Sequence, residues 1–121
     1  MRILIVDDEP IIRRSLLRVG KSLGDEMFEA EDGLLGFEAM KSVKPDLVFL
    51  DVLMPKLTGP QMLEKVGDKG DIKVVLMSAY SGEYNLQTAK ALGADLFLAK
   101  PFDDIFKVFN EAKKLVGGTH D

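Results

Sequence analysis

The sequence contains no cysteine, and this absence excludes disulfide bonds, thiolate metal sites and cysteine nucleophiles. No apolar run approaches the roughly 18 residues that a membrane-spanning helix needs. The N-terminal segment turns acidic at Asp7, directly after the apolar residues 3–6, which is unlike a secretory signal peptide. From these absences we expect a protein of the cytoplasm without a membrane-spanning segment.

The sequence also lacks a block of lysine and arginine residues. Its net charge is -4 and its isoelectric point is about 5.0, so we expect no direct binding to nucleic acid. Proteins or small anions are the partners that this charge favours. With 121 residues, 46% of them hydrophobic and 30% charged, the chain has the size and composition of one compact domain, which we expect to span residues 1–121.

Short apolar segments alternate along the chain with longer segments of helical periodicity. We expect strands at 2–6, 26–30, 46–50, 72–77 and 95–99, and helices from Pro10, at 34–42, 60–66 and 83–92, and from about Asp103. Pro10 is a favourable first residue of a helix, and the Gly117-Gly118 pair is expected to end the last one. This alternation predicts a doubly wound α/β fold, with a parallel sheet covered by helices on both faces.

Polar residues gather directly after the predicted strands, where functional groups lie in this class of fold. They are Asp7, Asp8 and Glu9 after the first strand, Asp51 after the third, Ser78 after the fourth and Lys100 after the fifth. If the first and third strands are neighbours, the three aspartates share one small pocket. At about 5 Å each pair of carboxylates repels by roughly 3 kcal/mol, so the pocket requires cations or protons.

A divalent cation together with Lys100 would balance the three aspartate charges. Oxygen-only ligands favour Mg²⁺ or Mn²⁺ over zinc. Carboxylates, a cation, a hydroxyl and an ammonium around one point are the components of phosphoryl transfer, and Asp51 is the candidate nucleophile. Such compensation also explains why the strongly apolar segment 46–50 leads into a carboxylate, which would otherwise be costly to bury.

Four short motifs together resemble the receiver domains of two-component response regulators, of the chemotaxis-regulator type. They are VDDEP at 6–10, LDVLMP at 50–55, MSA at 77–79 and AKPF at 99–102, in the order of that family. Each motif alone has little specificity, but the set is highly specific and covers essentially the whole chain. The resemblance implies a flavodoxin-like (βα)5 fold whose five-stranded parallel sheet has the order 2-1-3-4-5.

The resemblance implies a role for each acidic residue. Asp51 matches the phosphoacceptor, which takes a phosphoryl group from the phosphohistidine of a sensor histidine kinase or a phosphotransfer protein. Asp8 matches the direct Mg²⁺ ligand, Asp7 its neighbour that often acts through water, and the backbone carbonyl of Leu53 a further ligand. Such a domain catalyses its own Mg²⁺-dependent phosphorylation and dephosphorylation without being an ordinary enzyme.

Further roles concern the switch that follows phosphorylation. Ser78 matches the hydroxyl that bonds a phosphoryl oxygen, and Lys100 the ammonium that pairs with it. The Lys100-Pro101 peptide bond is expected to be cis, which proline permits at low cost. Phe97 matches an aromatic residue that turns inward when Ser78 moves, although as a phenylalanine it also fits a plain core position.

The switch is expected to remodel the face made by the segments 83–92, 95–99 and the helix from about Asp103. Tyr84, Phe97 and Phe106 on this face would meet a downstream effector protein or a second copy of the chain. We further expect Leu53 and Tyr80 to shield the acyl phosphate from water and slow its hydrolysis.

The alternative functions are a phosphatase, a dinucleotide binder and a scaffold protein. A phosphatase of the haloacid dehalogenase type would need an Asp-x-Asp pair, and a dinucleotide binder a Gly-x-Gly-x-x-Gly turn, and the segment after the first strand has neither. The stronger alternative is a pseudo-receiver, a phosphorylation-independent scaffold. The basic residues of the first helix, Arg13, Arg14, Arg18 and Lys21, are interpreted as a solvated face, although the first helix of the family often docks a kinase.

Overall fold

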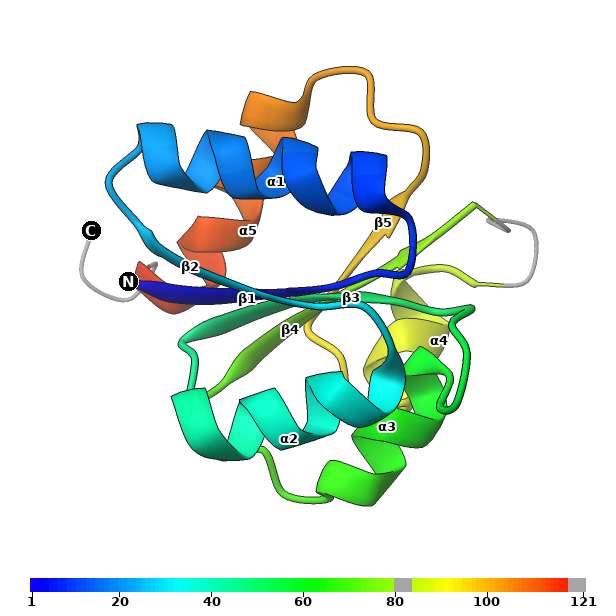
Figure 1. Ribbon diagram of the computed structural model, residues 1–121. Helices are drawn as coiled ribbons and strands as arrows, with labels where there is room; N and C mark the ends of the chain where they lie inside the picture. Colours follow the sequence, from blue (N-terminus) through cyan, green and yellow to red (C-terminus); the bar gives the residue numbers. More distant parts are fainter. Residues whose placement is uncertain (80–83, 118–121) are drawn as a thin grey trace.

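The computed structural model describes residues 1–79 and 84–117, which form a parallel sheet between two layers of helices (Figure 1). The strands are β1 (Arg2–Val6), β2 (Glu26–Ala30), β3 (Leu47–Asp51), β4 (Lys73–Ser78) and β5 (Leu96–Ala99). The helices are α1 (Pro10–Ser22), α2 (Gly33–Val43), α3 (Gly59–Val66), α4 (Leu86–Ala91) and α5 (Ile105–Gly117). The order β2-β1-β3-β4-β5 confirms the predicted flavodoxin-like fold.

The two faces of the sheet carry separate hydrophobic clusters. Helices α1 and α5 cover one face, and α2, α3 and α4 cover the other (Figure 1). Because successive side chains of a strand point to opposite faces, Ile3 and Ile5 belong to the first cluster and Leu4 and Val6 to the second. Strand β3, central in the sheet, is buried along its whole length, as its continuously apolar sequence predicted.

The predicted strand ends shift slightly, and two of these shifts bear on the polar residues. Strand β3 includes Asp51, which pairs with Met77, and β4 includes Ser78, which pairs with Ala99. Both polar residues are therefore the last residues of strands and not the first residues of loops. Backbone pairing with neighbouring strands holds them in place, so their positions are set by the sheet.

Helices α4 and α5 begin later than predicted because side chains cap them. Asn85 accepts a hydrogen bond from the backbone N–H of Thr88 at 2.9 Å, so α4 begins at Leu86 instead of residue 83. Asp104 accepts one from the N–H of Lys107 at 3.2 Å, and α5 begins at Ile105 instead of Asp103. None of the helices in the described part of the chain combines the length and the hydropathy that crossing a membrane requires.

Candidate functional site

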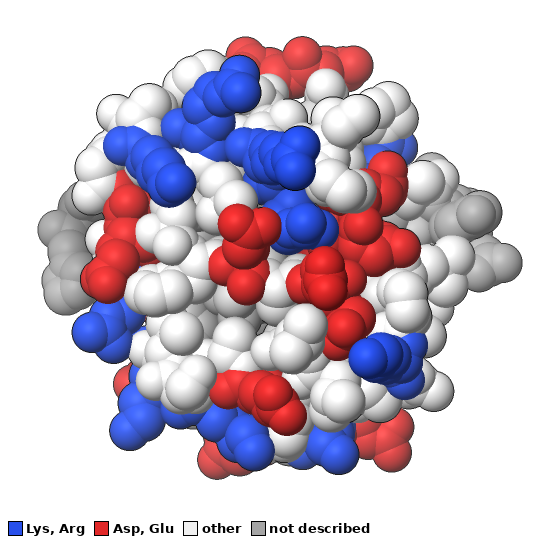
Figure 2. Space-filling view, viewed as in Figure 1, with Lys and Arg blue, Asp and Glu red and all other residues white. Residues whose placement is uncertain are grey.

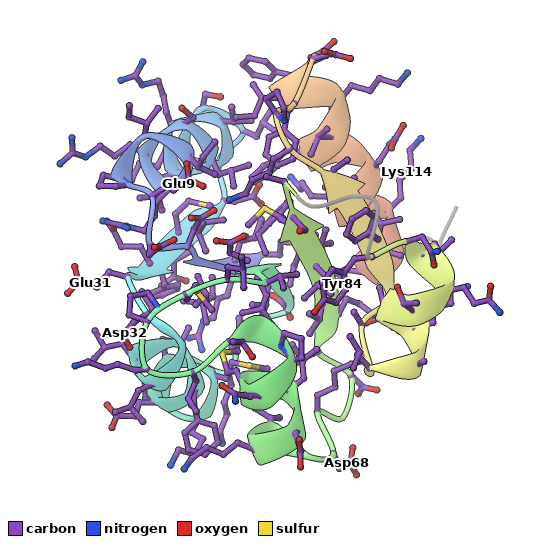
Figure 3. All side chains as sticks on the ribbon, turned by 90° about the vertical axis from the view of Figure 1, so that its right-hand side faces the viewer. Glu9, Glu31, Asp32, Asp68, Tyr84 and Lys114 are labelled. Carbon is purple, nitrogen blue, oxygen red and sulfur yellow. The ribbon has the colours of Figure 1, made fainter. Side chains whose placement is uncertain are left out.

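The carboxyl ends of the strands surround a hollow of about 300 Å³ at one end of the domain. Its lining residues are Asp8, Glu9, Asp51, Leu53, Ser78, Ala79 and Lys100. Figure 3 looks onto this end of the sheet, with Glu9 beside the start of α1. The parallel sheet brings the polar residues that were predicted from the strand ends to one place, although they are up to 93 positions apart in sequence.

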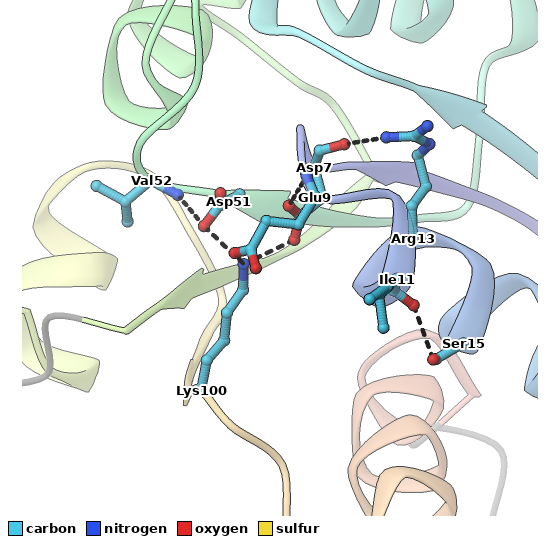
Figure 4. Close-up of polar contacts among 8 residues, drawn as sticks. All are labelled: Asp7, Glu9, Ile11, Arg13, Ser15, Asp51, Val52 and Lys100. Atoms are coloured by element: carbon cyan, nitrogen blue, oxygen red, sulfur yellow. Dashed lines mark hydrogen bonds and ion pairs between the residues drawn. The ribbon is translucent and has the colours of Figure 1, made fainter.

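Asp51 lies at the floor of this hollow and is 5% exposed. Its Oδ1 atom accepts a hydrogen bond from the backbone N–H of Val52 at 3.0 Å and lies 3.2 Å from the ammonium of Lys100 (Figure 4). A carboxylate this deeply buried needs such partners, because burial without them is costly. Asp51 is therefore fixed in orientation while one side of it faces the hollow.

Asp7 is completely buried, and its polar atoms are bonded. Its Oδ1 accepts the N–H of Glu9 at 2.9 Å, and its Oδ2 accepts a hydrogen bond from Lys100 at 2.8 Å. Its backbone N–H donates to the carbonyl of Ala30 at 3.2 Å, and its own carbonyl accepts from Arg13 at 2.7 Å (Figure 4). Asp8, by contrast, is exposed and extends into the hollow that it lines.

Lys100 contacts three carboxylates with a single ammonium group. Its Nζ lies 2.8 Å from Asp7, 3.1 Å from Glu9 and 3.2 Å from Asp51, and its side chain is 5% exposed. The backbone N–H of Lys100 donates to the carbonyl of Ser78 at 2.9 Å, which ties its position to the end of β4. The peptide bond to Pro101 is cis, which confirms the prediction made from the sequence.

The carboxylates of the site carry more negative charge than Lys100 neutralises. Burial, and then the neighbouring charge of Asp7, raise the pKa of Asp51 to about 7, although Lys100 acts in the opposite direction. Burial also raises the pKa of Asp7. Burial by itself lowers the pKa of Lys100, but the hydrogen bond to Asp7 and the charge of Asp51 outweigh it, and the net effect is a raised pKa.

The aspartates provide the donor set that a hard divalent cation requires. One carboxylate oxygen from each of Asp7, Asp8 and Asp51 lies within 4.8 Å of the others. All these donors are oxygens, which suit Mg²⁺ and Mn²⁺. A bound cation would also relieve the mutual repulsion that contributes to the raised pKa of Asp51. The residues therefore fit a divalent cation of this kind.

The loop after Asp51 is held in an unusual conformation. Lys56 has a positive φ of 73°, and the N–H of Leu57 donates to the carbonyl of Pro55 at 2.9 Å, which closes a γ-turn. Gly59 ends the loop so close to the sheet that a Cβ atom there would lie 2.4 Å from the carbonyl oxygen of Asp51. Leu53 in this loop is 51% exposed and borders the hollow.

The remaining predicted residues lie on the β4 and β5 side of the site. Ser78 is 2% exposed and lines the hollow. Phe97 and Tyr84 are both partly buried against the hydrophobic cluster under α2, α3 and α4, and Figure 3 labels Tyr84. Phe106 is 51% exposed on α5. Tyr80, predicted to shield the site, lies outside the described residues.

Two residues have contacts that the sequence did not reveal. Glu9 was assigned only to the polar strand end, yet it is the third carboxylate partner of Lys100 and adds a fourth acidic group to the charge balance. Arg13 was interpreted as part of a solvated face, and this is wrong. Its side chain is 12% exposed and pairs with Glu29 at 2.6 Å, whereas Arg14, Arg18 and Lys21 are exposed as predicted.

The chain is similar to known signalling proteins. The family model described as response regulator receiver domain matches residues 3–107. The chain is 40% identical over 104 residues to the sporulation initiation phosphotransferase F of Bacillus subtilis, covering 84% of this chain and 83% of that protein. It is 35% identical over 101 residues to a probable transcriptional regulator, ycf27, of Porphyridium aerugineum, covering 84% of this chain but only 42% of that protein, so it spans less than half of that relative.

Solved structures show the same similarity. The response regulator protein TrrA from Thermotoga maritima, in complex with Mg(2+)-BeF, has a TM-score of 0.81 and 34% identity, covering 94% of this chain and 97% of that one. The receiver domain of the Francisella response regulator 1452 has a TM-score of 0.87 over 98% of both chains, at 24% identity, and supports the fold alone.

Proposed function

The chain belongs to the response regulator receiver domain family, and on this premise we propose that Asp51 accepts a phosphoryl group from a phosphohistidine. Receiver domains of this family act in two-component signalling with histidine kinases or phosphotransfer proteins as partners. The observation that carries the assignment to Asp51 is its position at the end of buried β3, 3.2 Å from Lys100 and within 4.8 Å of the carboxylates of Asp7 and Asp8. This arrangement supports Asp51 as a nucleophile, because Lys100 and a cation held by the aspartates would compensate the negative charge of the site.

The transfer is a displacement at phosphorus. A carboxylate oxygen of Asp51 forms a new bond to phosphorus, and the P–N bond of the phosphohistidine breaks. The electron pair of that bond goes to the imidazole nitrogen of the leaving histidine. The product is an acyl phosphate on Asp51, which water later hydrolyses back to the carboxylate and inorganic phosphate. Positioning and charge neutralisation supply most of the catalysis in such reactions.

Asp7, Asp8, Asp51 and the backbone carbonyl of Leu53 are the proposed holders of Mg²⁺, with Mn²⁺ as a substitute. The ion would supply positive charge that offsets the phosphoryl oxygens as the new bond forms. Asp7 already accepts hydrogen bonds from Lys100 and from the N–H of Glu9, which supports binding of the cation through water. Asp8 is exposed, which supports its direct contact with the cation. The three aspartate oxygens, within 4.8 Å of one another, support this assignment.

Ser78 and Lys100 are proposed to contact the oxygens of the phosphoryl group that Asp51 carries. Both line the hollow that Asp51 faces, and their backbones are joined by the hydrogen bond from the Lys100 N–H to the Ser78 carbonyl. The Ser78 hydroxyl would donate to one phosphoryl oxygen and the Lys100 ammonium would pair with another. Phe97, only partly buried on β5, would turn inward as Ser78 moves.

The face formed by α4, β5 and α5 is the proposed output surface, contacting an effector protein or a second copy of the chain. Partly buried Phe97 lies on β5, exposed Phe106 lies on α5, and partly buried Tyr84 lies two residues before the start of α4. Amide hydrogen exchange of residues 84–109, with and without phosphorylation, tests this assignment. Changed protection is expected across this face, and identical exchange in the two states would contradict the proposal.

The alternative of a phosphorylation-independent scaffold is not supported. The acidic residues, the hydroxyl and the ammonium are all present at the site, and the relatives include a phosphotransferase. A scaffold would have no need to bury the charge of Asp51 beside a second aspartate, which raises its pKa.

Intact-mass analysis after incubation with acetyl phosphate tests the proposal. One phosphoryl adduct that requires both Mg²⁺ and Asp51 is expected. Asp51→Asn should abolish the adduct, and Asp71→Asn, at an exposed aspartate near the opposite end of β4, is the matched control that should retain it. No adduct in the wild-type chain under any condition would overturn the proposal.

A further inference from the structure

Arg13 connects helix α1 with both the site and the edge strand β2. Its Nη1 atom donates to the backbone carbonyl of Asp7 at 2.7 Å, and its Nε donates to Oε1 of Glu29 at 2.6 Å (Figure 4 shows the first of these contacts). The side chain is 12% exposed, although it is one of the four basic residues on α1. Lysines and arginines gather over α1 in Figure 2, and the neighbouring Arg14 is exposed.

The contact with Asp7 restrains the orientation of the peptide group that joins Asp7 to Asp8. A peptide group is planar, so a hydrogen bond to the carbonyl oxygen of Asp7 also restrains the N–H and Cα of Asp8. Asp8 is exposed, and its carboxylate has no hydrogen bond or ion pair among the described residues. The direction in which this carboxylate leaves the backbone therefore depends on the peptide plane that Arg13 holds.

Glu29 fixes the guanidinium group from the other side. An arginine presents several N–H donors in one rigid plane, so a bond from Nε to Glu29 orients the Nη1–H that reaches Asp7. The N–H of Arg13 also donates to the carbonyl of Glu9 at 3.1 Å, which closes the first turn of α1. The side chain of Arg13 thus connects the segment between β1 and α1 with strand β2 through hydrogen bonds.

We propose that Arg13 is a positioning residue of the divalent-cation site, which holds the Asp7–Asp8 peptide group in the orientation that cation binding requires, with Glu29 orienting the guanidinium. The inference rests on the proposed function, because it needs Asp7 and Asp8 to hold the cation. Groups that orient metal ligands without touching the metal commonly change affinity by about 10-fold to 100-fold.

Long-range electrostatics alone predict the opposite change in cation affinity when Arg13 is replaced. The direction of the change therefore tests the proposal. Removing a positive charge near a cation site strengthens cation binding if only long-range electrostatics matter. Loss of the positioning contact weakens it. Arg13→Met and Arg14→Met remove the same charge from adjacent residues of α1, but only the first removes the hydrogen bond to Asp7. The two variants therefore separate positioning from charge.

Isothermal titration with Mn²⁺, on protein shown by circular dichroism to be folded, gives the direct measurement. Arg13→Met is expected to bind Mn²⁺ about 10-fold more weakly than the wild type, and Arg14→Met equally or slightly more tightly. In labelling with acetyl phosphate, Arg13→Met should raise the half-saturating Mg²⁺ concentration while leaving the rate at saturating Mg²⁺ close to that of the wild type. A purely structural role of Arg13 would not raise the half-saturating Mg²⁺ concentration while leaving the rate at saturating Mg²⁺ unchanged.

A second pair of variants applies if Arg13→Met does not fold. Glu29→Gln removes the partner of Arg13 but keeps the arginine, and Glu31→Gln is its control at an exposed residue that lies just beyond β2. Glu29→Gln should weaken Mn²⁺ binding by more than Glu31→Gln does. Equal affinities within either pair of folded variants would overturn the inference, whereas a wild-type chain that binds no Mn²⁺ would overturn the proposed function itself.

Discussion

The ammonium group of Lys100 lies 3.1 Å from Oε1 of Glu9, a carboxylate at the mouth of the site. The side chain of Glu9 is 58% exposed, whereas those of Asp7 and Asp51, which contact the same ammonium, are 0% and 8% exposed. Exposed ion pairs contribute only about 0–1 kcal/mol to stability. Glu9 is therefore the partner that Lys100 would release at the smallest cost if a phosphoryl group entered the site as proposed.

Removing the charge of Glu9 tests whether it competes with the phosphoryl group. Glu9→Gln should lower the free energy of unfolding by less than about 1 kcal/mol. It should accelerate labelling of Asp51 by acetyl phosphate by about threefold, or roughly 0.6 kcal/mol, because an anion then approaches a less negative site. The time course of intact mass measures the rate, with Glu64→Gln on the exposed face of α3 as the control. Slower labelling would show that Glu9 supports Lys100 instead of competing for it.

The raised pKa of Asp51 predicts how stability depends on pH without metal. Because the folded pKa is about 7 and the unfolded value is about 3.9, the folded protein binds this proton more tightly, and ionisation of Asp51 destabilises it. The penalty, at most about 4 kcal/mol, is complete above pH 7 and disappears as the pH falls through the window to about 4.

Asp51→Asn should therefore raise the free energy of unfolding in EDTA at pH 8, and the difference from the wild type should shrink toward pH 4. Mg²⁺ should stabilise the wild type more at pH 8 than at pH 6, because ionised carboxylates bind it. Urea denaturation at each pH measures both effects. The same urea midpoint for both proteins at pH 8 would exclude a penalty from Asp51.

Gly59 allows the loop to pack closely on Asp51, because it has no Cβ atom. In Gly59→Ala the new Cβ would lie 2.4 Å from the carbonyl oxygen of Asp51, so the backbone must move, at a cost of about 1–3 kcal/mol. We expect a lower unfolding midpoint and slower labelling of Asp51. Gly70→Ala, with a φ of 58° and open space around it, should lose stability without slower labelling. If both variants label like the wild type, the contact does not position Asp51.

Shielding of the acyl phosphate by Leu53 and Tyr80 stays a prediction. Leu53 borders the hollow, as shielding requires, and Tyr80 lies outside the described residues. The double substitution Leu53→Asn with Tyr80→Glu should admit water and accelerate loss of the phosphoryl group. Decay of the phosphorylated mass after removal of acetyl phosphate measures this, and an unchanged half-life would reject the shielding hypothesis.

Much of the fold followed from local patterns. Strand β3 was predicted from its apolar residues, and the polar residues at the strand ends identified one end of the sheet as the site. The helix starts were less accurate at α4 and α5, because capping by Asn85 and Asp104 depends on backbone geometry that apolar periodicity does not report.

The sequence by itself determined the alternation of strands and helices and the polar strand ends, because periodicity is local in the chain. Its motifs identified the family, and the resemblance to that family implied the sheet order and the convergence of Asp7, Asp51 and Lys100 that the structure shows. Only the tertiary structure decided which basic and acidic residues beside the site are exposed. Arg13 and Arg14 are adjacent and chemically identical, but the contacts with β2 leave the side chain of Arg13 only 12% exposed, whereas Arg14 is in solvent. Such pairing depends on distances between elements far apart in sequence, which no local pattern encodes.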